Sequence, residues 1–144
     1  PNVSTNLITY GALYNWYAIN TTTNGNKNVC PTGWHVPTDG EWTTLTTYLG
    51  GETVAGGKMK EAGLAHWSSP NTGATNESGF AGLPGGYRYY DGTFYHIGNY
   101  GYWWSSTEYS TTTARFRFLY NSFGNVYRSS FNKGSGFSVR CLRN

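Results

Sequence analysis

The sequence predicts an α+β fold in which a small twisted antiparallel sheet carries one or two helices and long irregular loops. Three observations support this prediction: a capped helix early in the chain, four β-type segments in the last third, and a composition with 20 glycines and only 12% charged residues. A chain of 144 residues has the size of one domain with its own hydrophobic core. We therefore expect a single domain over residues 1–144.

The first half of the chain contains one clear helix signature. Thr38 can cap this helix, and Glu41 can complete a capping box. Its buried stripe is expected to consist of apolar residues three and four positions apart, namely Trp42, Leu45 and Leu49. The glycine pair at 50–51 ends the helix.

Three other segments before position 87 are less regular. The aromatic segment 10–19 could be a strand or a buried helical turn, and its periodicity does not decide between them. A weaker helical piece, interrupted by glycines, is expected around 58–62. The stretch 65–86 is rich in Gly, Ser, Asn and Pro, so we expect it to be irregular.

The last third of the chain is predicted to be β. Its candidate strands are rich in aromatic and β-branched residues and cover 101–106, 114–120, 126–130 and 136–142. In the last of them Phe137, Val139 and Cys141 alternate with Ser138 and Arg140. This alternation directs one face of the strand, with the cysteine, toward the core.

The two cysteines, Cys30 and Cys141, are separated by most of the chain. Because no CxxC or HxxxH spacing supports a metal site, a disulfide is the preferred interpretation. It would close a loop of about 110 residues and contribute roughly 4 to 5 kcal/mol by restricting the unfolded chain. Two buried free thiols in a reducing compartment are the alternative.

The charge pattern bears on the class of partner. Ten Lys and Arg against seven Asp and Glu give a net charge of +3 without any basic run, which gives little support to nucleic-acid binding. The apolar stretches are too short to cross a bilayer, and no signal peptide is present. We predict no nucleic-acid partner and no direct membrane insertion, and we expect any export signal or anchor to lie outside this fragment.

Four motifs occur in order along the chain: CPTGWHVPTDGEW at 30–42, LPGGYR at 83–88, GYWWSSTE at 101–108 and GFSVRC at 136–141. In these motifs the chain closely resembles the Fibrobacter succinogenes major paralogous domain, from about Tyr10 to Arg143. The resemblance implies a C-type-lectin-like fold related to formylglycine-generating enzymes, with paired terminal strands and an extracellular or cell-surface location. It does not imply any activity.

A second resemblance concerns function. Some variable proteins of diversity-generating retroelements carry this domain, with a variable region that here corresponds to about 101–141. Adenine randomisation makes such regions rich in Asn, Tyr, Ser and Phe, and more than half of the residues in 109–135 are of these four types. The positions between them form a frame that looks fixed: Ala114, Arg117, Leu119, Gly124, Val126, Arg128 and Lys133.

The segment 114–120 has an aromatic face and an arginine face, because Phe116, Phe118 and Tyr120 alternate with arginines and Leu119. Hydrophobic patterning alone favours rings in the core and arginines in water. The resemblance to variable proteins implies the reverse, and combining the two we favour exposed rings. We expect one solvent-facing patch lined by Phe116, Phe118, Tyr120, Phe123, Tyr127 and Phe131.

An exposed set of this composition has the chemistry of a paratope, since Tyr and Phe supply rigid contact area while Ser and Asn supply adaptable hydrogen bonds. We predict a non-enzymatic binding or adhesion domain of a secreted, cell-surface, pilus or phage-tail protein. It needs no cofactor, and its partner is a protein or glycan receptor. The predicted ligand-binding residues are Tyr109, Ser110, Phe116, Phe118, Tyr120, Asn121, Ser122, Phe123, Tyr127, Ser129, Ser130, Phe131, Asn132 and Ser135.

Two lectin-type functions and a structural role are alternatives. Calcium-dependent sugar binding could use loop oxygens of Asn76, Glu77, Asp91 and Asn99, although the motifs typical of calcium lectins are missing and we predict no metal site. Stacking on sugars without metal could use the six tryptophans, of which we expect three to be buried: Trp42, Trp103 and Trp104. The structural alternative is a spacer module of a surface fibre.

Catalysis receives little support. His35, His66 and His96 lie in unrelated contexts, and no spacing suggests a nucleophile with a base and an orienting acid. Both cysteines match the structural pair of the family rather than the reactive cysteines of formylglycine-generating enzymes. We therefore do not carry that activity over.

Overall fold

The computed structural model describes residues 4–22 and 24–144. Its elements are α1 (Ser4–Tyr10), β1 (Tyr14–Asn15), α2 (Trp16–Ile19), β2 (Trp34–His35), α3 (Asp39–Tyr48), α4 (Glu52–Met59), β3 (Tyr87–Arg88), β4 (Phe94–Tyr95), β5 (Tyr100–Glu108), β6 (Thr113–Tyr120), β7 (Val126–Asn132), β8 (Gly136–Phe137) and β9 (Leu142–Arg143). The named strands pair antiparallel, and the helices are short. This arrangement is α+β, as predicted.

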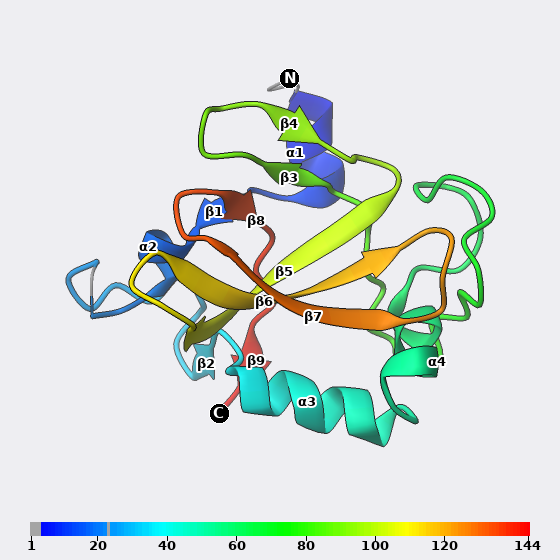
Figure 1. Cartoon of the computed structure of the whole chain (residues 1–144), viewed down its shortest axis with the longest axis horizontal. Helices are drawn as coiled ribbons and strands as arrows, with labels where there is room; N and C mark the ends of the chain where they lie inside the picture. The colour runs from blue at the N-terminus through cyan, green and yellow to red at the C-terminus, as the bar shows by residue number, and fades with distance from the viewer. Residues whose placement is uncertain (1–3, 23) are drawn as a thin grey trace.

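A three-stranded sheet with the order β5-β6-β7 runs through the middle of the molecule (Figure 1). Helices α3 and α4 lie on one side of it, and a four-stranded sheet with the order β1-β8-β3-β4 lies on the other. Trp103 and Leu119 pack with Trp42 of α3 in one buried cluster, whereas Trp104 and Phe116 pack with β8 in a second. The central sheet therefore has a hydrophobic core on both faces.

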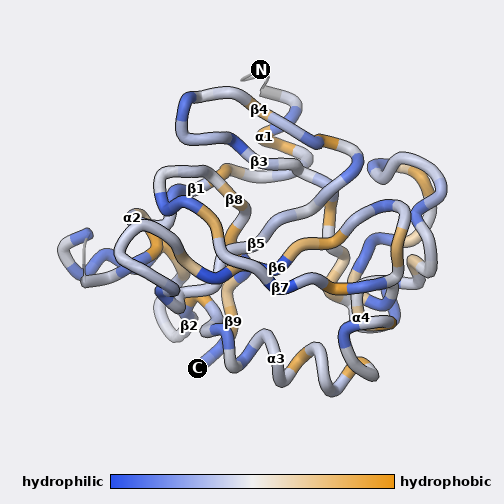
Figure 2. Tube along the Cα trace, viewed as in Figure 1, coloured by the Kyte–Doolittle hydropathy of each residue, from blue (hydrophilic) through white to orange (hydrophobic). Residues whose placement is uncertain are grey.

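This double coverage explains the hydropathy pattern of the central strands. Hydrophobic and hydrophilic residues alternate along most of β6 (Figure 2), yet the alternation does not separate a buried face from a solvent-exposed one. Arg117 is 3% exposed, and Phe116 on the opposite face is 5% exposed. The alternation identifies two faces correctly but cannot say which of them meets solvent.

Helix α3 begins as the sequence predicts. Thr38 Oγ1 accepts a hydrogen bond from the Glu41 N–H at 3.2 Å, and Glu41 Oε2 accepts one from the Thr38 N–H at 2.8 Å. Both halves of the capping box are thus present. Trp42 and Leu49 are buried, and the helix ends before Gly50, whose φ of 103° suits glycine.

Helix α4 corrects the predicted helical piece at 58–62, because it spans Glu52–Met59 and ends where that piece was expected to begin. Its two glycines are tolerated because they allow close packing rather than interrupting the helix. The Gly57 N–H donates to the Gly124 carbonyl at 2.8 Å, and a Cβ on Gly56 would lie 1.9 Å from the Asn125 oxygen. The backbone of α4 therefore lies directly against the turn between β6 and β7.

The segments 10–19 and 136–142 each form two short elements instead of one. The segment 10–19 contains both alternatives, since the strand β1 is followed at once by the helical turn α2. The expected strand 136–142 is divided into β8 and β9, because its two ends pair with different partners, β1 and β2. The predicted strands at 101–106, 114–120 and 126–130 are confirmed as β5, β6 and β7, each extended by one to three residues.

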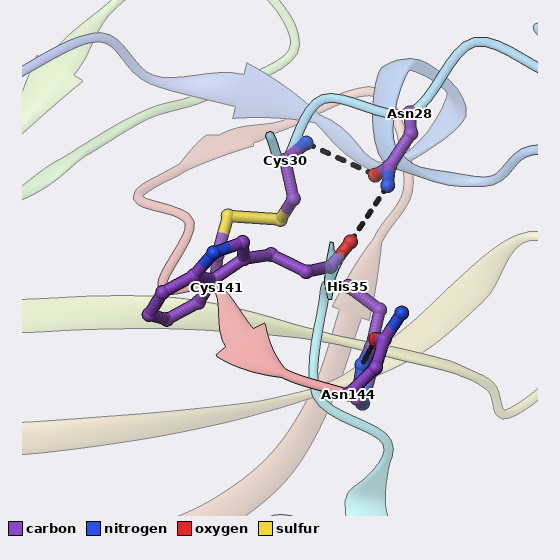
Figure 3. The surroundings of a disulfide bond; sticks show 6 residues. Asn28, Cys30, His35, Cys141 and Asn144 are labelled. Carbon is purple, nitrogen blue, oxygen red and sulfur yellow. Dashed lines mark hydrogen bonds between the residues drawn. A yellow bond between two sulfur atoms is a disulfide. The ribbon is translucent and has the colours of Figure 1, made fainter. Parts of the chain in front are cut away.

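The predicted disulfide is present. Cys30 and Cys141 are bonded with their Cα atoms 5.8 Å apart, and β2 pairs with β9 beside them. The Asn28 side chain fixes the backbone beside Cys30, since it accepts a hydrogen bond from the Cys30 N–H and donates one to the Trp34 carbonyl (Figure 3). These contacts tie the last residues of the chain to its first third.

The irregular stretch 65–86 is confirmed as largely free of helices and strands, and Lys60 anchors part of it. The ammonium of Lys60 is fully buried and donates to the carbonyls of Thr72, Tyr120 and Phe123 at 2.9 to 3.1 Å. Burial lowers the pKa of Lys60 to about 8. Through these three hydrogen bonds, Lys60 joins the end of α4 to the irregular stretch and to the turn after β6.

Candidate binding surface

The predicted ligand-binding residues lie on β6, β7 and the turns around them, but they are not equally accessible. Tyr109, Ser110, Phe123 and Asn132 are exposed. The half-buried members are Phe118, Tyr120, Ser122, Tyr127, Ser129, Ser130 and Phe131. Three members are buried and correct the prediction: Phe116, Asn121 and Ser135.

Each of the three has a physical reason for being enclosed. Phe116 lies under β8, with its ring 4.9 Å from that of Phe137. Asn121 donates from its amide to the carbonyls of Ser68 and Ser69 and thereby joins two loops. Ser135 lies in the turn between β7 and β8, where its N–H donates to the Asn132 carbonyl.

The expected patch is therefore shorter than predicted, because Phe116 is buried whereas Phe118 and Tyr120 on the same face of β6 are half-buried. Phe116 packs against β8, whereas Phe118 stacks on Tyr127 of the neighbouring strand at 4.7 Å and stays half-buried. Trp42, Trp103 and Trp104 are buried as predicted, and so is Trp67. Of the frame positions, five are buried: Ala114, Arg117, Leu119, Val126 and Lys133.

The rings of β6 and β7 contact further aromatic residues that the sequence did not indicate as part of the binding surface. Tyr100 of β5 stacks on Tyr120 at 4.2 Å, and His96 lies 4.7 Å from Tyr100. At the other side Phe131 contacts Tyr87 and Tyr89 of the β3–β4 hairpin. We call this set the aromatic surface, and it comprises Tyr87, Tyr89, Tyr95, His96, Tyr100, Phe118, Tyr120, Phe123, Tyr127 and Phe131.

The hairpin that contributes to the aromatic surface could have been found in the sequence. Asp91-Gly92 is a typical hairpin turn, and aromatic residues flank it on both sides. Tyr87 pairs with Tyr95 across this hairpin, and their rings stack at 5.4 Å. Tyr95 is 41% exposed, so the hairpin presents rings to solvent rather than covering them.

A cleft lies next to the aromatic surface, between α1 and the β3–β4 hairpin, and has a volume of about 360 Å³. Tyr87, Tyr95 and His96 belong both to the aromatic surface and to its lining. Burial lowers the pKa of His96, and its Nδ1 lies 2.9 Å from the Tyr102 hydroxyl. Burial also raises the pKa of Tyr102, so both groups are neutral near pH 7.

Buried charges elsewhere hold the sheet rather than face the aromatic surface. Asp39 accepts from Arg117 at 2.6 Å and from two nitrogens of Arg128. Burial alone would raise the pKa of Asp39, but the hydrogen bonds and charges of the two arginines lower it to about 2. Lys133 donates to Glu108 and to the Thr111 carbonyl, and its ammonium lies over the Trp16 ring.

Three of the four residues considered for calcium, Asn76, Glu77 and Asp91, have side chains engaged in separate local contacts. Asn76 accepts from the Ala81 N–H, and Asp91 accepts from the Thr93 N–H. Glu77 lies 3.3 Å from Lys58 on α4. Within 4–22 and 24–144, no group of three His, Cys, Asp or Glu side chains is placed to hold a metal ion.

The family model of the Fibrobacter succinogenes major domain matches residues 1–143, so the chain belongs to that family. Searches of curated proteins and of solved structures found no match. None of the described helices combines the length and apolarity that a membrane span requires.

Proposed function

We propose that this domain is a non-catalytic binding module that captures a protein or glycan receptor on its aromatic surface. One observation carries the proposal: half-buried and exposed rings follow one another without a gap from the β3–β4 hairpin across β5, β6 and β7. Contiguous apolar surface of this kind on a soluble protein usually marks an interaction site. Tyr is suited to the task, because its ring is large and rigid and its hydroxyl can hydrogen-bond.

We further propose that the fold is of the C-type-lectin type. Pairing between the two ends of the chain supports this assignment, since β1 pairs with β8 and β2 pairs with β9. The long irregular stretch between α4 and β3 supports it as well. The disulfide favours an oxidising, extracellular compartment, as expected for a surface or phage-tail protein.

Diversification of the segment 101–141 is part of the same proposal. The buried frame residues, among them Leu119 and Val126, could stay constant while exposed positions such as Tyr109, Phe123 and Asn132 change. The coding DNA provides the test, because a diversified segment should have a near-copy that differs only at adenines. A segment without such a copy would argue for a fixed specificity.

The binding proposal is tested by removing exposed rings without disturbing the core. The variant Tyr95→Ser/Phe123→Ser changes two rings that are 41% and 49% exposed. We expect affinity for receptors found in glycan and protein screens to fall at least tenfold, because aromatic anchors dominate such interfaces. Thermal unfolding of the variant should stay close to that of the wild type.

Tyr48→Ser is the matched control, since Tyr48 is 85% exposed on α3, away from the aromatic surface (Figure 1). This variant loses a tyrosine ring of the same kind and should bind like the wild type. Equal binding by all three proteins would place the site elsewhere and refute the proposal.

A further inference from the structure

The cleft between α1 and the β3–β4 hairpin has the size and lining of a small-ligand site. Its volume of about 360 Å³ lies in the lower part of the range of roughly 300 to 1,000 Å³ found for ligand pockets. Tyr87, Phe94 and Tyr95 of the hairpin line the cleft together with Tyr10 of α1. Phe94 and Tyr95 are both 41% exposed, so their rings are available to a ligand.

The described residues that line the cleft include a positively charged side chain but no negatively charged one. Arg88 lines the cleft, and no Asp or Glu is among the lining residues. Within the described part of the chain no carboxylate lies within 4 Å of Arg88; the nearby hairpin residue Asp91 instead accepts from the Thr93 N–H. Because His96 is neutral near pH 7, the Arg88 guanidinium is the one charged group among the described residues that line the cleft.

We propose that this cleft binds a carboxylate-bearing sugar, such as a uronic acid unit of an acidic polysaccharide. The sugar ring lies against the Phe94 ring, and its carboxylate pairs with Arg88, which is the cross-strand partner of Phe94 on the same face of the hairpin. A guanidinium matches a carboxylate through two parallel hydrogen bonds. The Asn6 amide and the tyrosine hydroxyls offer partners for the hydroxyl groups of the sugar. This inference rests on the proposed function and adds the class of ligand.

The test is a titration with tri-galacturonic acid and with its methyl ester, in which each carboxylate is replaced by an uncharged ester group. Amide NMR signals of residues 85–98 report on the cleft. We expect the acid to bind at least tenfold more tightly than the ester. Arg88→Met should remove that preference, so that the acid and the ester bind with similar affinity. Arg143→Met is the matched control, because it removes the same charge from β9 on the opposite side of the molecule and should bind like the wild type (Figure 1).

Equal affinity for the acid and the ester would overturn the inference, as would equal losses in Arg88→Met and Arg143→Met. An acidic peptide such as hexaglutamate that binds as tightly as the sugar would show that the ligand class is wrong. The two proposals fail separately. If a receptor binds through Tyr95 and Phe123 but the cleft does not bind galacturonate, this inference alone is overturned. If neither a receptor nor galacturonate binds at these residues, both proposals are overturned.

Discussion

Asp39 is the residue through which the first turn of α3 is joined to the central sheet. Its carboxylate accepts hydrogen bonds from Arg117 on β6 and Arg128 on β7. Arg117 is 3% exposed, so its guanidinium depends on this carboxylate for a counter-charge. A buried charge that loses its partner destabilises a protein far more than a surface ion pair contributes.

Asp39→Asn is expected to lower the free energy of unfolding by about 3 kcal/mol at pH 7, because it leaves Arg117 buried without a counter-charge. The folded-state pKa of Asp39 is about 2, against an ordinary value of 3.8. The stabilisation by the carboxylate is therefore complete above about pH 4 and is lost as the pH falls toward 2, which amounts to about 2 kcal/mol. Urea unfolding at pH 7 and pH 2.5 measures both effects.

The control for this prediction is Asp91→Asn. Asp91 is exposed in the hairpin turn, and an amide oxygen can still accept from the Thr93 N–H. Its stability should stay within about 0.5 kcal/mol of the wild type. A difference between Asp39→Asn and the wild type that does not shrink in acid would contradict the assigned role of the carboxylate.

The burial of individual side chains in the candidate site was harder to predict from the sequence than the strands that carry them. The alternation along β6 placed Phe116 and Arg117 on opposite faces correctly. Both are buried, however, because one face meets β8 and the other meets α3. A rule that assigns one face of a strand to water fails when a sheet is covered on both sides, and no local pattern reveals the second cover.

At the scale of elements, the sequence predicts structure where local chemistry is sufficient. The capping box at Thr38 and the three long strands are set by neighbouring residues, and all of them are confirmed. The split of 136–142 into β8 and β9 is set by distant partners on β1 and β2. The β3–β4 hairpin is predictable only in part. Its Asp91-Gly92 turn is set by local sequence, but its role in the aromatic surface depends on the distant contact with Phe131.

The packing of α4 gives a prediction at this scale. Gly56→Ala should favour the isolated helix by up to about 1 kcal/mol. In the protein, however, its Cβ would lie 1.9 Å from the Asn125 oxygen, so α4 and the β6–β7 turn must separate. We expect a net loss of about 2 kcal/mol, measured by thermal unfolding.

Gly40→Ala is the matched control, because Gly40 is also helical but its Cβ would meet nothing closer than Thr38 Oγ1 at 3.9 Å. This variant should gain about 0.5 to 1 kcal/mol. A gain in stability in both variants would show that helix propensity, and not the contact with the turn, decides the outcome.

At the scale of the whole molecule, the two ends of the chain are held together by short pieces that cannot be stable alone. Strands β1, β2, β8 and β9 each contain two residues. Pairs this short contribute few hydrogen bonds, and isolated two-stranded ribbons are marginal in water. The bond between Cys30 and Cys141 is therefore expected to maintain the pairing that closes the domain.

Removal of this bond should destabilise the whole domain rather than one element. The two cysteines are 111 residues apart, and cross-linking a loop of that length restricts the unfolded chain by about 4 to 5 kcal/mol. For a protein of this size the melting temperature should fall by roughly 10 to 15 °C in a reducing buffer. The variant Cys30→Ser/Cys141→Ser should show the lower melting temperature in both buffers. A wild-type melting temperature that is unaffected by complete reduction would mean that the short strands hold the chain ends without the covalent link.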